Sequence, residues 1–321
     1  MSAGRVNVKV SVIVPARDAE RTLPRTLATL ADQDLGEAYE VIVVDNGSRD
    51  GTAALAERSS AVTNVVRRAR GEGPGAARNA GVEAARGSVL VFLDSDCRVV
   101  PGWLAAGVRA LEDADLVQGR VLPDPERDLG PFDRTLSVGA AHGLFETANL
   151  FVRREVFARA GGFPAGLEPS GGAPFGEDVI FGYRARREGA RTSFSPDALA
   201  YHEVSARDAA GYVAERRRLA LFPLLAARVP ELRESFFYRR YFLSRRSAGF
   251  DLAVAGLGVA LVSGRRAALA VTVPYLALVG AHARTWGARR APLVAVTEIV
   301  ADAAGAVALA RGSAASRSLV L

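Results

Sequence analysis

The stretch Val89-Leu-Val-Phe-Leu93, which runs directly into Asp94-Ser95-Asp96, decides the fold of this chain. An apolar run of this length is typical of a parallel strand that is buried on both faces. Open α/β sheets bind ligands at the carboxyl ends of their strands, where these two carboxylates lie. A cation is the natural partner of such a pair, and oxygen ligands suit Mg²⁺ or Mn²⁺. A helix cap or a plain turn is the alternative interpretation.

The N-terminal part of the chain alternates between strand and helix patterns up to about residue 122. Repeated βαβ units of this length predict an α/β fold with a mostly parallel central sheet and flanking helices. Between 123 and 205 the pattern is less regular, and the Gly/Pro-rich residues 164–176 are a candidate lid. The strands are expected near 10–14, 40–44, 61–66, 89–93 and 148–152, with shorter pieces near 192 and 199.

The character of the sequence changes twice beyond this domain, which we place at residues 1–205. Residues 206–246 form an arginine-rich helical connector, and 247–321 an all-helical apolar region that we expect to associate with a membrane surface. Its three apolar segments are each shorter than the roughly 20 residues of a comfortable span. The third also carries Glu298 and Asp302, which are unfavourable in hydrocarbon. A soluble helical hairpin is the alternative.

Charge and cysteine content limit the choice of partner and compartment. The chain has 41 basic and 35 acidic residues, and Lys9 is its single lysine. This modest positive balance suits anionic small molecules or an anionic membrane surface. No basic stripe with interleaved aromatics points to nucleic acid. One cysteine, Cys97, excludes an intramolecular disulfide and fits a reducing compartment. No signal peptide precedes the first strand, so we expect the catalytic part on the cytoplasmic face of the membrane.

Acidic residues recur at one edge of the predicted sheet. Asp18 follows the first strand and Asp45 ends the second, on the same edge as the Asp94–Asp96 pair. Such a row suits a nucleotide-sugar, with early acids near the base or ribose and later ones holding a metal on the diphosphate. The glycine loop that ends at Gly75 leads into Arg78 and Asn79, which adds backbone donors, a helix dipole and a guanidinium. Taken alone, this loop could be an ordinary connection.

Five motifs, in this order and spacing, resemble the family 2 glycosyltransferases of the GT-A fold. The resemblance covers roughly residues 8–205 and implies an enzyme that transfers a sugar from a nucleotide-sugar donor with the help of a divalent metal. The motifs are Val12-Ile-Val-Pro-Ala-Arg-Asp18, Val43-Val-Asp-Asn-Gly-Ser48 with Asp50-Gly51, Gly75-Ala-Ala-Arg-Asn-Ala-Gly81, Phe92-Leu-Asp-Ser-Asp96 and Gly176-Glu-Asp178.

The same resemblance implies a role for individual residues. Asp96 would bind the metal, and Asp94 with Ser95 would face the nucleotide and ribose. His202 matches a histidine that touches the metal or diphosphate in several members, and a structural histidine is the alternative. The residues implied to line the nucleotide pocket are Pro15, Arg17, Asp18 and Asp45, with Arg78 near it.

The catalytic base is expected at the Glu177-Asp178 pair. An inverting transfer needs a carboxylate to deprotonate the acceptor hydroxyl while positive charge neutralises the departing diphosphate. Asp178 can do the first and the metal with Arg78 the second, and the resemblance likewise assigns the base to Asp178 with Glu177 beside it. A helix cap is the alternative role for Asp178.

Two departures and two rival functions complete the prediction. Asp18 stands where the family often has glutamate. No tryptophan follows Arg216-Arg217-Arg218, which favours single-sugar transfer over processive synthesis; these arginines touch phosphates or form a solvated helix face. An aspartyl-phosphate phosphatase would need a lysine after Lys9. A non-catalytic nucleotide-sugar-binding or membrane scaffold protein is the alternative function. The donor nucleotide (UDP, GDP or dTDP) and a hydroxyl acceptor, including a lipid-linked one, are left open.

Overall fold

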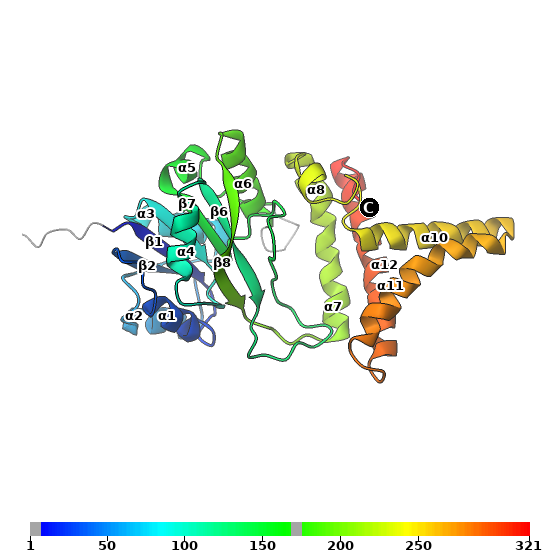
Figure 1. Cartoon of the computed structure of the whole chain (residues 1–321), viewed down its shortest axis with the longest axis horizontal. Helices are drawn as coiled ribbons and strands as arrows, with labels where there is room; N and C mark the ends of the chain where they lie inside the picture. The colour runs from blue at the N-terminus through cyan, green and yellow to red at the C-terminus, as the bar shows by residue number, and fades with distance from the viewer. Residues whose placement is uncertain (1–7, 168–174) are drawn as a thin grey trace, which may run out of the picture. The chain divides into compact units, whose positions relative to one another are not determined.

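The computed structural model describes residues 8–167 and 175–321 (Figure 1). These residues form two compact units. Unit 1 spans Met1–Asp128 and Thr135–Val204, and unit 2 spans Leu129–Arg134 and Ser205–Leu321. Most of the candidate lid, residues 168–174, lies outside the described residues.

Unit 1 is built on one mixed sheet, in which the described strands follow the order β3-β2-β1-β4-β7-β6-β8-β5. The first four are parallel, as the βαβ pattern predicts. β7 pairs antiparallel with β4 and β6, which makes the sheet mixed. The strands are β1 Val10–Ala16, β2 Tyr39–Asp45, β3 Asn64–Arg67, β4 Val89–Leu93, β5 Cys97–Val99, β6 Leu116–Pro123, β7 Asn149–Arg153 and β8 Thr192–His202.

The two strand pieces expected near 192 and 199 are one continuous strand, β8. Its register against β6 jumps between Gly119↔Ser195 and Arg120↔Leu199. Three residues of β8, beginning with Pro196, are therefore extra, as in an enlarged β-bulge. Proline cannot donate to the ladder, which explains both the break in the sequence pattern and the bulge that replaces it. This strand ends at His202, one of the candidate site residues.

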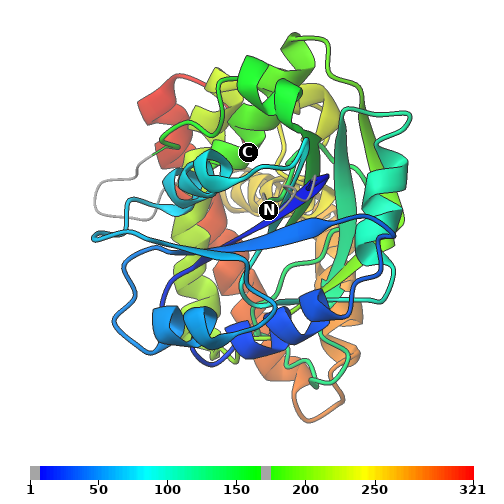
Figure 2. The same cartoon turned by 90° about the vertical axis from the view of Figure 1, so that its left-hand side faces the viewer.

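Helices cover both faces of this sheet. One face packs against α1 and α2 with α4, and the opposite face against α3, α5 and α6. Figure 2 shows α1 and α2 on one side of the blue strands and α3 on the other. The helices are α1 Leu23–Ala31, α2 Thr52–Arg58, α3 Pro74–Ala84, α4 Trp103–Ala110, α5 Arg154–Arg159 and α6 Glu177–Arg187.

A glycine sets how closely α3 approaches the sheet. A Cβ atom at Gly81 would lie 2.4 Å from Ile13 Cγ2 and 3.0 Å from Val44 Cγ2, so a side chain there would push the helix outwards. Both strand residues are fully buried. The close contact holds α3, and with it Arg78 one turn earlier, against the strands whose ends carry the acidic residues.

Unit 2 is helical throughout its regular elements, as predicted. Its C-terminal part holds three helices that are long and apolar enough to cross a membrane by length and composition, at Arg245–Ser263, Arg266–Arg284 and Ala291–Ser316. The elements are α7 Ala209–Glu215, η1 Arg216–Leu221, α8 Phe222–Arg228, α9 Leu232–Ser235, α10 Arg245–Ser263, η2 Arg266–Thr272, α11 Val273–Arg284 and α12 Ala291–Ser316.

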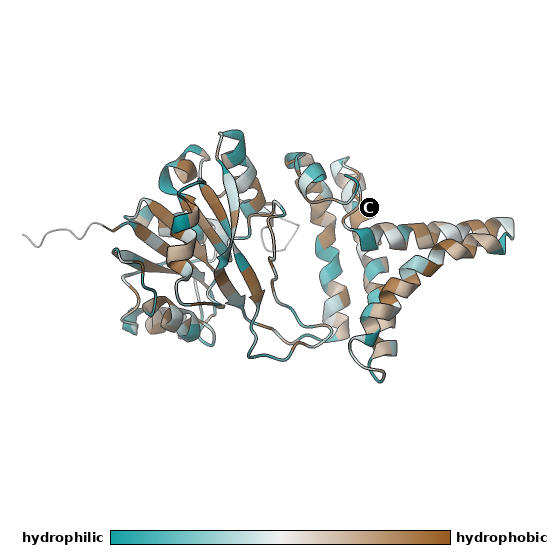
Figure 3. Ribbon diagram, viewed as in Figure 1, coloured by the Kyte–Doolittle hydropathy of each residue, from teal (hydrophilic) through white to brown (hydrophobic). Residues whose placement is uncertain are grey.

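The apolar surface of unit 2 is largely uncovered. Figure 3 shows hydrophobic residues along the length of α10, α11 and α12, and Val262 is 90% exposed. Helix α12 has 26 residues rather than the 18 of the apolar segment at 293–310, which is about 39 Å of helix and enough for a hydrocarbon core of about 30 Å. So much exposed apolar surface favours membrane association over a soluble hairpin.

The two acids that counted against a membrane location have partners inside unit 2. Arg246 of α10 lies 3.3 Å from Glu298 Oε1 and 2.8 Å from Asp302 Oδ2. Tyr275 of α11 donates to Asp302 Oδ2 at 2.7 Å, and His282 Nδ1 lies 2.6 Å from Glu298 Oε1. The three apolar helices are thus joined by one polar network, which reduces the cost of placing these acids in an apolar region.

Candidate functional site

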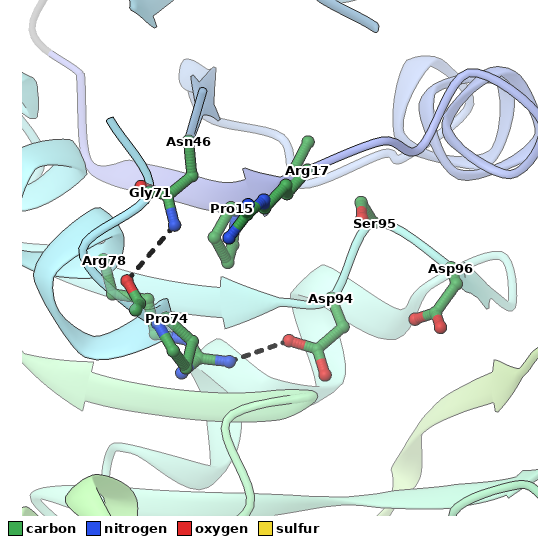
Figure 4. A pocket seen from close by; sticks show the side chains of 11 residues that line it. Pro15, Arg17, Asn46, Gly71, Pro74, Arg78, Asp94, Ser95 and Asp96 are labelled. Atoms are coloured by element: carbon green, nitrogen blue, oxygen red, sulfur yellow. Dashed lines mark hydrogen bonds and ion pairs between the residues drawn. The ribbon is translucent and has the colours of Figure 1, made fainter. Parts of the chain in front are cut away.

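A pocket of about 680 Å³ opens at the carboxyl ends of β1 and β4 (Figure 4). This is the edge where the sheet pattern places a ligand, between neighbouring strands β1 and β4 and the loop before α3. Its lining is Pro15, Ala16, Arg17, Asn46, Gly71, Gly73, Pro74, Arg78, Asp94, Ser95 and Asp96.

The two aspartates that follow β4 have different surroundings. Strand β5 follows them rather than a helix, so neither is a helix cap; a turn closed by Cys97 N–H to Asp94 C=O leaves both side chains available. Asp94 Oδ1 accepts from Arg78 Nη2 at 2.9 Å. Figure 4 shows Asp94 directed at Arg78 and Asp96 on the other side of Ser95. Asp94 is thus neutralised by the protein, whereas Asp96 is not paired with a guanidinium in the described part of the chain.

Asp96 lies beside the end of β8. Its Oδ1 is 3.6 Å from His202 Nε2, and a cluster of Asp96, Cys97 and His202 has ligand atoms within 4.8 Å of one another. Burial raises the pKa of Asp96, and the Asp94 charge adds to this while His202 opposes it. The thiol pKa of Cys97 is raised well above its usual value by burial, so the thiol keeps its proton and is a poor ligand. An oxygen from Asp96 and a nitrogen from His202 fit a divalent cation.

A hydrogen bond sets the orientation of the His202 ring. Nδ1 lies 2.8 Å from the carbonyl oxygen of Glu203. A carbonyl can only accept, so Nδ1 carries the hydrogen and Nε2 presents its lone pair towards Asp96. A histidine ligand usually has such a carbonyl partner on its other nitrogen. The contact is what a metal ligand needs, and it also satisfies a structural histidine.

Arg78 connects this pocket to the start of α6. The guanidinium is buried, and its Nη1 donates to Glu177 Oε1 at 3.2 Å while Nη2 donates to Asp94. One side chain of α3 therefore joins a carboxylate of the pocket to the acid pair. Sequence reasoning placed Arg78 near the pocket, but it did not foresee the contact with Glu177, which lies 99 residues away in the chain.

Asp178 occupies the first turn of α6. Gly176 is the N-cap, with φ at 76°, so Asp178 is not the capping residue. Its Oδ1 accepts from the Val179 amide at 2.8 Å. Burial raises the pKa of Asp178 well above its usual value, the Glu177 charge raises it further, and the Val179 amide and Arg78 act in the opposite direction. A carboxyl with a raised pKa next to a pocket is a candidate for proton transfer.

The remaining predicted nucleotide residues separate into two groups. Pro15, Arg17 and Ser95 line the main pocket. Asp45 lines a neighbouring pocket of about 690 Å³, which shares Arg17 and Gly71 with the first and contains four further arginines. The Asp18 carboxylate accepts from the Arg49 amide at 2.7 Å, in the loop that borders this second pocket.

Gly75 and Asn79 lie beside the pocket rather than in its described lining. A Cβ atom at Gly75 would lie 3.0 Å from Glu177 Cγ, so this glycine permits the close approach of α3 to the start of α6. The Asn79 amide group donates to the Phe163 carbonyl at 2.8 Å and accepts from the Phe163 amide at 3.0 Å. In this arrangement both residues position neighbours, and their contact with a nucleotide stays a prediction.

The geometry agrees with known proteins of one family. Residues 11–164 match the model described as Glycosyl transferase family 2. The chain belongs to this family. Glycosyltransferase AglE from Haloferax volcanii is 34% identical over 60% of this chain and 66% of its own length. The undecaprenyl-phosphate 4-deoxy-4-formamido-L-arabinose transferase of Pseudomonas aeruginosa is 37% identical over 34% of each protein. The chain thus spans less than two thirds of the length of these relatives.

Solved structures show the same fold. The mannosyltransferase PcManGT from Pyrobaculum calidifontis, in complex with GDP-Man and Mn²⁺, has a TM-score of 0.65 and 24% identity, covering 93% of this chain and 86% of its own. TarS 1–349 from S. aureus, in complex with UDP-GlcNAc, has a TM-score of 0.53 and 20% identity, covering 97% and 93%. The predicted family and the GT-A-like fold are confirmed.

Sequence reasoning missed several residues of this family 2 site. Asn46, which follows Asp45, lines the pocket and donates to the Gly73 carbonyl at 3.3 Å; its position directly after a strand-end acid was a usable signal. Glu146, in the loop before β7, lies near enough to Asp178 for its charge to raise the pKa of Asp178. No pattern in the sequence marks Glu146 as part of the site.

Proposed function

We propose that this family 2 chain transfers a single sugar from a nucleotide-diphospho-sugar to a hydroxyl acceptor with inversion at the anomeric carbon. The observation that supports this most is the bridge from Asp94 through Arg78 to Glu177, which joins the strand-end pocket to the acid pair. The pocket volume of about 680 Å³ suits a nucleotide-sized ligand. The complexes of PcManGT with GDP-Man and of TarS with UDP-GlcNAc support a nucleotide-sugar as that ligand.

Donor binding is assigned to the pocket lining. Pro15 and Arg17 lie at the end of β1, and Ser95 follows β4. Asp94 accepts hydrogen bonds from the ribose, because its charge is already balanced by Arg78 and needs no metal. Asp45 and the arginines of the second pocket take the far end of the nucleotide. We leave the base and the sugar open, since these contacts discriminate neither.

Asp96 and His202 would hold a divalent cation, Mg²⁺ or Mn²⁺, through one carboxylate oxygen and Nε2. When bound there, the cation supplies positive charge to the diphosphate of the donor. The Mn²⁺ in the complex of PcManGT supports this assignment. Arg78 contributes part of its charge from the other side of the pocket, between Asp94 and Glu177.

Asp178 acts as the general base. Its carboxylate takes the proton of the acceptor hydroxyl while the acceptor oxygen forms a bond to the anomeric carbon. The bond from that carbon to the diphosphate oxygen breaks, and the nucleoside diphosphate leaves with the electron pair. Glu177, held by Arg78, keeps a negative charge beside Asp178, and this raises the basicity of Asp178. A stronger base at the same position removes the proton more readily.

The apolar helices of unit 2 attach the protein to a membrane, with the transferase unit on the cytoplasmic face. The undecaprenyl-phosphate transferase relative supports an envelope or lipid-linked context for the acceptor. Truncation after about residue 246 removes α10, α11 and α12. We expect full-length protein to partition into membranes and the truncated protein to stay in the soluble fraction; full-length protein that is soluble without detergent contradicts the attachment.

The test of the function is release of nucleoside diphosphate from UDP-, GDP- and dTDP-sugars by detergent-solubilised full-length protein, with and without Mn²⁺. We expect at least one donor to be consumed with the metal and none with Asp96→Asn. The matched control is Asp197→Asn, an exposed aspartate of β8, which should behave as wild type. Tight binding of a nucleotide without turnover of any donor would instead establish the scaffold alternative.

A further inference from the structure

Three acids gather at the start of α6. Glu177 and Asp178 are adjacent, and the charge of Glu146 is close enough to raise the pKa of Asp178. Arg78 is the cation beside them, and its two terminal nitrogens already donate to Glu177 and Asp94. The space next to Asp178 is therefore lined by hydrogen-bond acceptors rather than by free positive charge.

The position of Glu146 is fixed by its neighbour Phe145. Phe145 has φ at 55°, a left-handed conformation that a non-glycine residue keeps only where packing demands it. Its ring lies on α6, where a Cβ atom at Gly182 would come 2.1 Å from Phe145 Cδ2, and it meets the Tyr183 ring at 5.6 Å in a T-shaped contact. The helix that carries Asp178 thus also holds the turn that carries Glu146.

The backbone of Glu146 is held from the sheet side as well. Its carbonyl accepts from Gln118 Nε2 at 3.1 Å and from the Asn149 amide at 3.3 Å. Gln118 belongs to β6 and Asn149 opens β7, both in the same sheet. With both sides anchored, the side chain has a defined place near Asp178.

The Glu146 carboxyl lacks part of the hydrogen bonding that a buried acid needs. Its Oε1 lies 3.3 Å from His142 Nε2, and the side chain is 14% exposed. Its Oε2 is buried and has no hydrogen-bond partner in the described residues. Burial raises the pKa of Glu146 to about 7 and lowers the pKa of His142. An unpaired buried acceptor is costly, so this oxygen is a place where a ligand donor stabilises the site.

On the basis of the proposed function, we propose that the acceptor is a neutral sugar-type polyol, and that Glu146 accepts a hydrogen bond from a hydroxyl next to the one that attacks. Hydroxyl groups donate to carboxylates, and neighbouring hydroxyls of a sugar ring can reach two acids at once. A phosphate monoester carries close to two negative charges. It would meet Glu146, Glu177 and Asp178 with Arg78 already engaged, and like charges select against such a ligand.

A free saccharide and a saccharide linked to a lipid share this chemistry. The test therefore uses full-length protein in detergent with Mn²⁺ and the nucleotide-sugar panel, against three sets of acceptor probes. These are free disaccharides, neutral octyl glycosides and a polyprenyl monophosphate. We expect transfer to at least one neutral probe and none to the polyprenyl monophosphate. Preference for the octyl glycosides over the free disaccharides points to the lipid-linked source, and the reverse to the free one.

Glu146→Gln tests the residue itself. We expect the acceptor KM to rise about tenfold, a change of about 1.4 kcal/mol, while the donor KM changes by less than twofold. Glu155→Gln, an exposed glutamate of α5, is the matched control and should keep both values. If the glutamine variant does not fold, Glu146→Asp, which keeps the charge and shortens the side chain, gives the same comparison.

Three results overturn the proposal. Transfer to the polyprenyl monophosphate excludes a neutral acceptor. An unchanged acceptor KM in Glu146→Gln excludes the contact. Consumption of a donor by water alone, with none of the neutral probes accepted, excludes the acceptor class and leaves the proposed donor chemistry intact. Consumption of no donor under any condition overturns the proposed function and this inference with it.

Discussion

Each unit of this protein buries an arginine between two carboxylates, and the two arrangements differ in what surrounds them. In unit 1, Arg78 lies between Asp94 and Glu177. In unit 2, Arg246 lies between Glu298 and Asp302. Both acids of unit 2 have a second protein partner, His282 for the one and Tyr275 for the other. Around Arg78, by contrast, additional acids lie close by without such partners.

The difference shows how a polar cluster reveals its role. A cluster whose acids are paired twice joins helices, and it is replaceable by apolar side chains of similar volume. A cluster with spare acceptors beside a pocket holds carboxyls whose pKa values are raised, and Asp178 and Glu146 are the two examples. Raised pKa values next to a pocket indicate chemistry rather than packing. The following predictions test this contrast, from the largest effect to the smallest.

Asp178→Asn should reduce sugar transfer by roughly 10³-fold or more, because loss of a general base has effects of this order. Donor binding should persist, since the pocket lining is unchanged. In the wild type, the raised pKa means that the carboxylate is lost at a higher pH than for an ordinary aspartate, so transfer should fall as pH decreases through that raised value. Rates across pH, with Asp197→Asn as control, provide the measurement; a variant that retains wild-type rates would remove Asp178 from the mechanism.

Arg246→Met should lower the free energy of unfolding by about 4 kcal/mol, because it leaves two buried acids without their cation. The triple variant with Glu298→Gln and Asp302→Asn should recover most of that loss. Thermal unfolding in detergent measures both, and donor binding serves as the control that should stay constant. If the triple variant is as unstable as the single one, the network does more than join the helices.

Glu146→Gln should change how stability depends on pH. The pKa of Glu146 is 4.5 as a reference and about 7 in the folded protein. A raised pKa contributes stability that is fully present below the unfolded value and lost as pH rises through the folded value. The variant should therefore match the wild type near pH 4 and exceed it above pH 7 by about 3 kcal/mol. Equal pH dependence of the two melting temperatures would show that Glu146 is not buried as an acid.

Ser244→Ala should have the smallest effect, a loss of about 1 kcal/mol. Ser244 is the N-cap of α10; its hydroxyl accepts from the Ser247 amide at 3.1 Å, and the Ser247 hydroxyl returns the contact. Arg246 lies in the first turn of that helix, so loss of the cap loosens the residue that holds the network. Thermal unfolding beside Arg246→Met measures the difference, and additive losses would show that cap and network act separately.

Most of the strands and helices of unit 1 could be predicted because they carry strong local patterns. Strand β4 is an uninterrupted apolar run, as burial on both faces requires. The same reasoning divided β8 at Pro196, since a bulged strand looks like two strands in sequence. Partners along the sheet could not be predicted, and β7 runs against β4 rather than with it.

The candidate site could be predicted only where strand ends carry charge. Asp94 and Asp96 follow directly from the end of β4, so the sequence placed them correctly at the pocket. Asn79 looked like a ligand from its place in a glycine-rich motif, yet its side chain holds the Phe163 backbone. Position in a motif does not report where a side chain points.

The amino-acid sequence alone determined that this chain has a parallel α/β core, acids at one sheet edge, a family 2 pattern and three apolar segments. These features depend on local periodicity and on the order of strand ends. Only the tertiary structure decided that Arg78 joins Asp94 to Glu177, that Glu146 lies near Asp178 and that Arg246 pairs with the acids of α12. These contacts join residues far apart in the chain, and packing rather than local pattern brings them together.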